Sequence, residues 1–158
     1  LKRTARGNRF MSFDTRSHKV MIAENERAVA EMLQIRLDVA GYHTMCCRNG
    51  AQTMEILSVM RPDVLILDLG LPDMDGWSIL QALTNRFGKV PFPVLVMGRR
   101  LGVEDVRRAV SMGARDCLAK PFSGAEIVDR VERLLRRPAP VASAVAEARQ
   151  LAAVESRF

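Results

Sequence analysis

Residues 64–76 read Val64-Leu65-Ile66-Leu67-Asp68-Leu69-Gly70-Leu71-Pro72-Asp73-Met74-Asp75-Gly76. A short apolar run that is bounded by turn residues is typical of a fully buried strand in a parallel sheet. The run ends in the carboxylate of Asp68, and open parallel sheets bind ligands at the carboxyl ends of their strands. A helix cap or a turn would also account for an aspartate here. The run alone therefore leaves a functional and a structural interpretation open.

The composition indicates one globular domain. The chain has 158 residues, of which 48% are hydrophobic and 27% charged, and this rules out extensive disorder. There is no apolar run long enough to span a membrane and no secretory signal with an apolar centre. Cys46 and Cys47 are adjacent, and together with Cys117 they have neither disulfide nor zinc spacing. We therefore expect reduced thiols and a cytoplasmic protein.

Strand and helix patterns alternate about every ten residues, and this predicts βαβ units and a parallel sheet. Glycine or proline residues separate most of the elements. The expected strands are residues 19–23, 43–47, 64–68, 94–97 and 115–119. The expected helices follow residue 26 up to Gly41, then cover residues 51–60, the segment after Gly76, residues 103–112 and the segment from Ser123 onward.

Three segments make up the chain in this interpretation: a basic flexible arm (1–18), the α/β domain (19–137) and a hinge with a C-terminal segment (138–158). The arm has five basic residues and one acidic residue. It is either a solvated leader, which we favour, or a contact for nucleic acid or anionic lipid. The segment after the hinge is rich in alanine. It is either a helix that docks on a partner or a frayed end.

Residues 19–137 resemble the receiver domain of bacterial two-component response regulators, the CheY-like family. The resemblance rests on the acidic turn Glu24-Asn25, on the run from Asp68 to Gly76, and on Gly113-Ala114 leading to Lys120-Pro121-Phe122. These motifs occur in the family's order and at its spacing. The resemblance implies a flavodoxin-like (βα)5 fold, a doubly wound parallel sheet with strand order 2-1-3-4-5.

The resemblance also implies a chemistry. The residue at the Asp68 position accepts a phosphoryl group, usually from the phosphohistidine of a histidine kinase. Mg²⁺ would be held by Glu24, Asn25, Asp68 and the backbone carbonyl of Gly70, because a hard cation with oxygen ligands offsets the repulsion between carboxylate and phosphoryl group. Lys120 would bind a phosphoryl oxygen.

Three positions depart from the family pattern. Asn25 replaces an acid, so the Mg²⁺ site loses one charge and should be weakened. Gly98 stands where the family has the Ser or Thr that hydrogen-bonds the phosphoryl group. Cys117 stands where the family has an aromatic switch residue. We therefore expect an atypical receiver in which phosphorylation of Asp68 is impaired or absent.

Arginines are concentrated in the second half of the domain. Residues 99–137 contain ten basic and six acidic side chains, and five of the basic ones are Arg99, Arg100, Arg107, Arg108 and Arg115. Arginine suits phosphates and guanine edges, so one interpretation is a cyclic dinucleotide site, for example for cyclic-di-GMP. A second is a contact for an acidic protein. A third, which we favour, is a solvated helix face.

These observations together predict a stand-alone atypical receiver that acts by protein–protein contact, with a histidine kinase or a downstream target as partner. We expect no enzymatic activity, no DNA-binding output domain and no membrane span. The alternatives are a cyclic-di-GMP effector and a conventional Mg²⁺-dependent phosphoacceptor in a phosphorelay.

Overall fold

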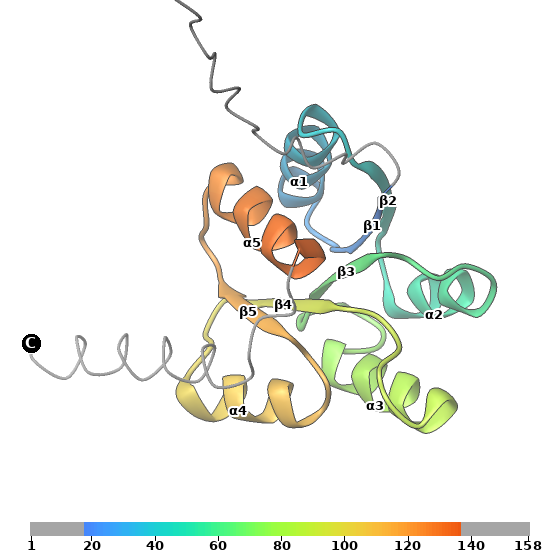
Figure 1. Ribbon diagram of the computed structural model, residues 1–158. Coiled ribbons are helices and arrows are strands. Elements are labelled where there is room, and N and C mark those ends of the chain that lie inside the picture. Colours follow the sequence, from blue (N-terminus) through green and yellow to red (C-terminus); the bar gives the residue numbers. More distant parts are fainter. Residues whose placement is uncertain (1–17, 137–158) are drawn as a thin grey trace, which may run out of the picture.

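The computed structural model describes residues 18–136, and it shows the predicted alternation of strands and helices (Figure 1). The strands are β1 (Lys19–Ala23), β2 (His43–Cys47), β3 (Val64–Asp68), β4 (Val94–Gly98) and β5 (Asp116–Ala119). The helices are α1 (Arg27–Val39), α2 (Gly50–Val59), α3 (Gly76–Phe87), α4 (Val103–Ser111) and α5 (Gly124–Arg136). The predicted arm (except His18) and the predicted hinge with its C-terminal segment lie outside the described residues. In the part described, no helix has the length and apolar character needed to cross a bilayer.

The five strands are all parallel and form one sheet in the order β2-β1-β3-β4-β5. Figure 1 shows α1 and α5 on one face of the sheet and α2, α3 and α4 on the other. The predicted fold class, a flavodoxin-like doubly wound sheet, is therefore confirmed. Because every strand runs the same way, all five carboxyl ends lie at one edge, where such folds bind ligands.

The apolar runs seen in the sequence form the two central strands. Every residue of β3 and β4 is buried, as expected where helices cover both faces of a parallel sheet. The edge strand β2 differs, since His43 and Met45 are exposed and Cys47 is buried. Successive residues of β3 enter different cores: Leu65 packs with the α3 side and Ile66 with the α1 and α5 side.

Side-chain caps position the helices as the sequence suggests. Asp75 accepts a hydrogen bond from the backbone N–H of Ser78 at 2.8 Å and begins α3. Ser123 and Glu126 form a reciprocal capping pair at the start of α5. After α1, Gly41 has a φ of 97°, a left-handed conformation that glycine adopts without strain.

A long-range contact ties the loop after β3 to the start of α2. The carboxylate of Asp73 accepts hydrogen bonds from the backbone N–H of Gly50 at 2.6 Å and of Ala51 at 2.9 Å. These bonds lower the pKa of Asp73. A Cβ at Gly50 would lie 2.5 Å from the Cβ of Met74, so the close approach requires glycine. The contact holds the loop that contains Gly70 against the body of the domain.

We predict that Asp73→Asn removes part of the acid sensitivity of folding. Because the pKa of Asp73 is lowered from 3.8 in the folded protein, its contribution to the free energy of unfolding is present above pH 3.8. It is lost as the pH falls through the lowered value. Urea unfolding between pH 7 and pH 2.5 should show the variant less stable at neutral pH and the two proteins converging in acid. A constant difference at all pH values would contradict the prediction.

Candidate functional site

Three separate segments bring their charged side chains together at the carboxyl edge of the sheet. Glu24 follows β1, Asp68 ends β3 and Lys120 follows β5. The ammonium nitrogen of Lys120 lies 2.6 Å from Oε2 of Glu24 and 3.4 Å from Oδ2 of Asp68. The peptide bond between Lys120 and Pro121 is cis. The sequence motifs that predicted a shared site thus meet around one cation.

Burial sets the electrostatics of this group. Glu24 is fully buried, Asp68 is 6% exposed and the side chain of Lys120 is 9% exposed. Burial raises the pKa of Glu24 against the opposing attraction of Lys120. Burial alone would lower the pKa of Lys120, but the carboxylates of Glu24 and Asp68 outweigh it and the pKa is raised. The lysine therefore stays charged.

The residues predicted to hold Mg²⁺ offer the type of ligand atom, oxygen, that this ion binds. Oε1 of Glu24 accepts a hydrogen bond from the backbone N–H of Glu26 at 2.8 Å, and its buried Oε2 pairs with the ammonium of Lys120 at 2.6 Å. The backbone at Gly70 passes beside Asp68, since a Cβ there would lie 3.7 Å from Oδ2. Asn25 is exposed. Carboxylate, amide and carbonyl oxygens are suitable ligands for Mg²⁺.

The charge of that ligand set is low. Within residues 18–136, no three His, Cys, Asp or Glu side chains are grouped so as to hold a metal ion. Two carboxylates are present, and both already face the ammonium of Lys120. An ion binding here would have to share Glu24 and Asp68 with that ammonium.

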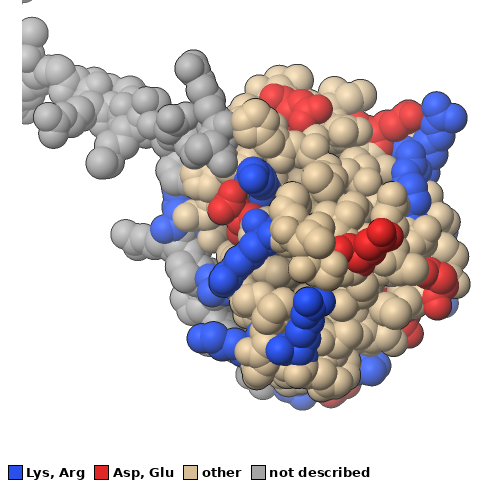
Figure 2. All heavy atoms as spheres, turned by 90° about the vertical axis from the view of Figure 1, so that its right-hand side faces the viewer, with Lys and Arg blue, Asp and Glu red and all other residues tan. Residues whose placement is uncertain are grey.

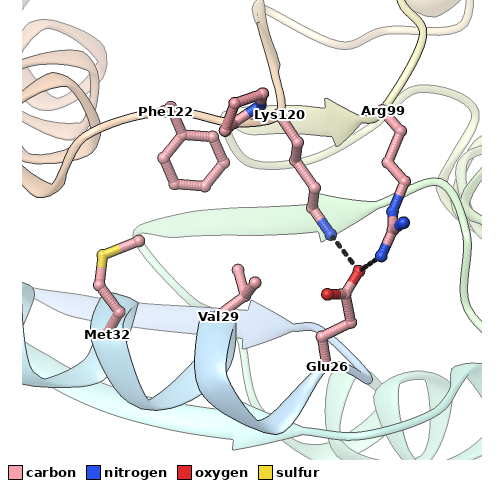
Figure 3. A pocket seen from close by; sticks show the side chains of 7 residues that line it. Glu26, Val29, Met32, Arg99, Lys120 and Phe122 are labelled. Carbon is pink, nitrogen blue, oxygen red and sulfur yellow. Dashed lines mark hydrogen bonds and ion pairs between the residues drawn. The ribbon is translucent and has the colours of Figure 1, made fainter.

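Glu26 carries a second ion pair that the sequence interpretation did not identify. Its carboxylate is bonded by the guanidinium of Arg99, from the loop after β4, and Oε1 lies 3.7 Å from Nζ of Lys120 (Figure 3). The hydrogen bond from Arg99 lowers the pKa of Glu26. The sequence indicated that Glu26 lies near the site, because it follows Glu24-Asn25 directly. It did not indicate the partner, Arg99, which is 73 residues away.

Two pockets lie on either side of this ion pair. One, of about 540 Å³, contains Asp68, Gly70, Trp77 and Arg100. The other, of about 370 Å³, has an apolar wall made by Val29, Met32 and Phe122, whose side chains surround it in Figure 3. The residues common to both pockets are Glu26, Arg99 and Lys120.

Leucine side chains lie close to Gly98, the last residue of β4. A Cβ built on Gly98 would lie 3.0 Å from Cδ2 of Leu101 and 3.4 Å from Cδ1 of Leu69. Leucine carbon atoms therefore occupy the space beside Gly98 that a side chain would use. A larger side chain at position 98 would therefore have to displace these leucine atoms.

Cys117 also takes part in apolar packing. It lies in β5 and packs against the core on the α3 side. Burial raises the pKa of its thiol to about 12, so the thiol is protonated at neutral pH. A small inert side chain thus stands at the expected position of the aromatic switch.

The five arginines proposed as one basic face lie in different places. Arg99 and Arg100 line the pocket of Asp68. Arg115 precedes β5, and its backbone N–H donates to the carbonyl of Val94, the first residue of β4. Since Arg99 follows the last residue of β4, Arg115 lies toward the opposite edge of the sheet.

The two arginines of α4 have partners close by. Arg107 pairs with Glu104 at 2.8 Å, and the guanidinium of Arg108 lies 4.3 Å from the centre of the Trp77 ring. On the side of the domain where α2 lies, Figure 2 shows basic and acidic side chains as small separate groups on a largely uncharged surface. The charges of Arg107 and Arg108 are thus shared with neighbouring side chains.

Comparison with known proteins agrees with this geometry. Residues 20–132 match the family model described as the response regulator receiver domain. The cell cycle response regulator CtrA of Brucella ovis is 30% identical over 119 residues, which are 75% of this chain and 50% of that protein. CtrA of Brucella anthropi matches equally well. The chain thus spans about half the length of the curated relatives it matches.

Solved structures give the same fold. A receiver domain of a signal transduction histidine kinase from Syntrophus aciditrophicus is 32% identical, with a TM-score of 0.68 over 76% of this chain and 91% of that one. The Francisella response regulator 1452 receiver domain is 26% identical, with a TM-score of 0.72 over 76% and 98%. CheY4 of Vibrio cholerae, at 24% identity and a TM-score of 0.70 over 75% and 98%, supports the fold alone.

We predict that positions 98 and 101 are energetically coupled. In the Leu101→Ala background, where space is available, Gly98→Ala should stabilise the end of β4. In the wild type the same substitution should leave the free energy of unfolding unchanged or lower it. The coupling should be about 1 kcal/mol, the usual range for residues in contact. Urea unfolding of the two single variants and the double variant measures it, and additive effects would contradict the proposed packing.

Proposed function

The chain belongs to the response regulator receiver domain family, and from this premise we propose that it is an atypical receiver in bacterial two-component signalling. In this proposal it acts in the cytoplasm, by contact with a histidine kinase or a downstream protein. Phosphorylation of Asp68 is impaired or absent, and the binding conformation does not depend on it.

The observation that carries this proposal is the packing of Leu101 and Leu69 beside Gly98. In the family, a Ser or Thr hydroxyl at this position links the phosphoryl group to the following loop. Here van der Waals contact holds the loop inward, and Arg99 attaches it to Glu26. A loop that is held by its own side chains has no need of a phosphoryl group to hold it.

The charges near Asp68 also support impaired phosphorylation. Mg²⁺, when bound, would neutralise charge between a carboxylate and an incoming phosphoryl group. Asn25 adds no charge to that site, and one unit-charge contact at 4 Å is worth ~4 kcal/mol at an effective dielectric of ~20. Lys120 would have to bind a phosphoryl oxygen while remaining paired with Glu24, 2.6 Å away.

A conventional Mg²⁺-dependent phosphoacceptor is the second candidate. It is favoured by the 3.4 Å distance between Lys120 and Asp68, which places the lysine where it could bind a phosphoryl oxygen. The cyclic-di-GMP alternative has less support, since only Arg99 and Arg100 of the five arginines line the same pocket. Calorimetry with cyclic-di-GMP, on the wild type and Arg100→Ala, tests it directly.

We predict that acetyl phosphate with Mg²⁺ leaves the protein largely unmodified. Intact-mass measurement should show little phosphoryl adduct in the wild type, none in Asp68→Ala, and more in Asn25→Asp, which supplies the missing charge. Hydrogen exchange at residues 99–102 should be the same with and without the phosphodonor. A wild-type adduct that forms readily and slows exchange in this loop would support the conventional phosphoacceptor and contradict our proposal.

A further inference from the structure

The carboxylate of Glu26 occupies a place between two cations. Arg99 hydrogen-bonds it from one side, and the ammonium of Lys120 lies 3.7 Å from the same oxygen, Oε1. Figure 3 shows both basic side chains directed at this carboxylate. Because these three residues line both pockets, the carboxylate stands at the boundary between the apolar cavity and the cavity of Asp68.

This carboxylate has no role in capping its helix. Glu26 is the residue before α1, but its side chain makes no cap hydrogen bond. Its principal contacts are instead with residues from the loops after β4 and β5. The arrangement is that of an oxyanion bound by a guanidinium and an ammonium, a combination that also binds phosphoryl oxygens.

We propose that Glu26 is an internal oxyanion, held by Arg99 and Lys120 where an oxygen of an incoming phosphate-like anion would bind, so that the two compete. The inference rests on the proposed function, for which it supplies one cause of impaired phosphorylation. Arg99 is then a second anion-binding residue of the site. Its guanidinium attracts the phosphoryl group, a role that a hydroxyl at position 98 would otherwise have.

The ion pair of Glu26 with Arg99 is weaker than the buried ion pairs of Lys120, as competition with an incoming anion requires. The side chains of Arg99 and Glu26 are 74% and 41% exposed, and an ion pair open to water is weak enough to be exchanged. Lys120, at 9% exposed, stays in place between Glu24 and Asp68. An anion could therefore displace Glu26 without dismantling the buried group.

The remaining charges of the cavity leave room for an anion once Glu26 moves. Glu24 and Asp68 oppose it from inside, and Lys120 and Arg99 compensate those two charges. On the rim are Arg100 and Asp105. Asp105 is already engaged, because its Oδ2 accepts a hydrogen bond from the backbone N–H of Gly102 at 3.0 Å. Removing the negative charge of Glu26 should thus favour anion binding.

The test uses inorganic phosphate as the probe and Trp77 as the reporter. Trp77 is the single tryptophan of the chain, and it lines the cavity of Asp68, so its fluorescence should change when phosphate binds. We predict that Glu26→Gln binds phosphate about tenfold more tightly than the wild type, because phosphate no longer competes with a charged carboxylate for Arg99 and Lys120. Arg99→Ala should bind phosphate more weakly than the wild type.

Glu31→Gln is the matched control. Glu31 is also an acidic residue of the α1 segment paired with an arginine, Arg27 at 2.8 Å, but it does not line either pocket. This variant should bind phosphate like the wild type. Circular dichroism verifies the fold of each variant, and Glu26→Ala replaces Glu26→Gln if the latter does not fold.

Each outcome decides the proposal. Tighter binding in Glu26→Gln with weaker binding in Arg99→Ala supports it. Unchanged binding in Glu26→Gln overturns it, and so does tighter binding in both variants, since the ion pair would then be only a steric barrier. The proposed function is judged separately by the wild-type adduct with acetyl phosphate. Ready phosphorylation of the wild type would contradict that function, whatever the phosphate affinities are.

Discussion

The site depends on the ammonium of Lys120, which lies between two carboxylates that have been removed from water. Glu24 is fully buried and Asp68 nearly so, and two buried like charges would destabilise the fold without a cation between them. Lys120 meets that need at 2.6 and 3.4 Å. It can do so because β1, β3 and β5 are parallel and end at one edge. The topology of the sheet thus makes the charge cluster stable.

Around this cluster, apolar packing occupies the positions at which the family has polar and aromatic switch groups. Leu101 and Leu69 contact the space beside Gly98, and the protonated thiol of Cys117 packs against the core on the α3 side. Such contacts are non-directional. Glu24, Asp68 and Lys120 form the charged group of the site, and Arg99 joins the loop after β4 to Glu26.

The arginines illustrate why local composition and surface character differ. Residues 99–137 have more basic than acidic side chains, yet Arg107 pairs with Glu104 and Arg108 stacks on Trp77. Charges that are paired with neighbours on the same or an adjacent helix contribute little to a long-range field. Arg99 is also paired, but its partner Glu26 belongs to the loop beside Asp68, so this ion pair lies at the site.

The sequence by itself determined the order of elements and the parallel sheet, and its resemblance to the receiver family implied the convergence of Glu24, Asp68 and Lys120. The order of elements and the sheet follow from periodicity, turn residues and strand ends, which are local properties of the chain. Boundaries shifted slightly, and β5 begins at Asp116 instead of residue 115. Only the tertiary structure decided that Leu101 fills the space beside Gly98, that Glu26 faces Arg99, and that Arg115 lies apart from Arg99. The contact between Glu26 and Arg99 joins loops that are 73 residues apart in the chain. All three features depend on how the elements pack together, which no local pattern encodes.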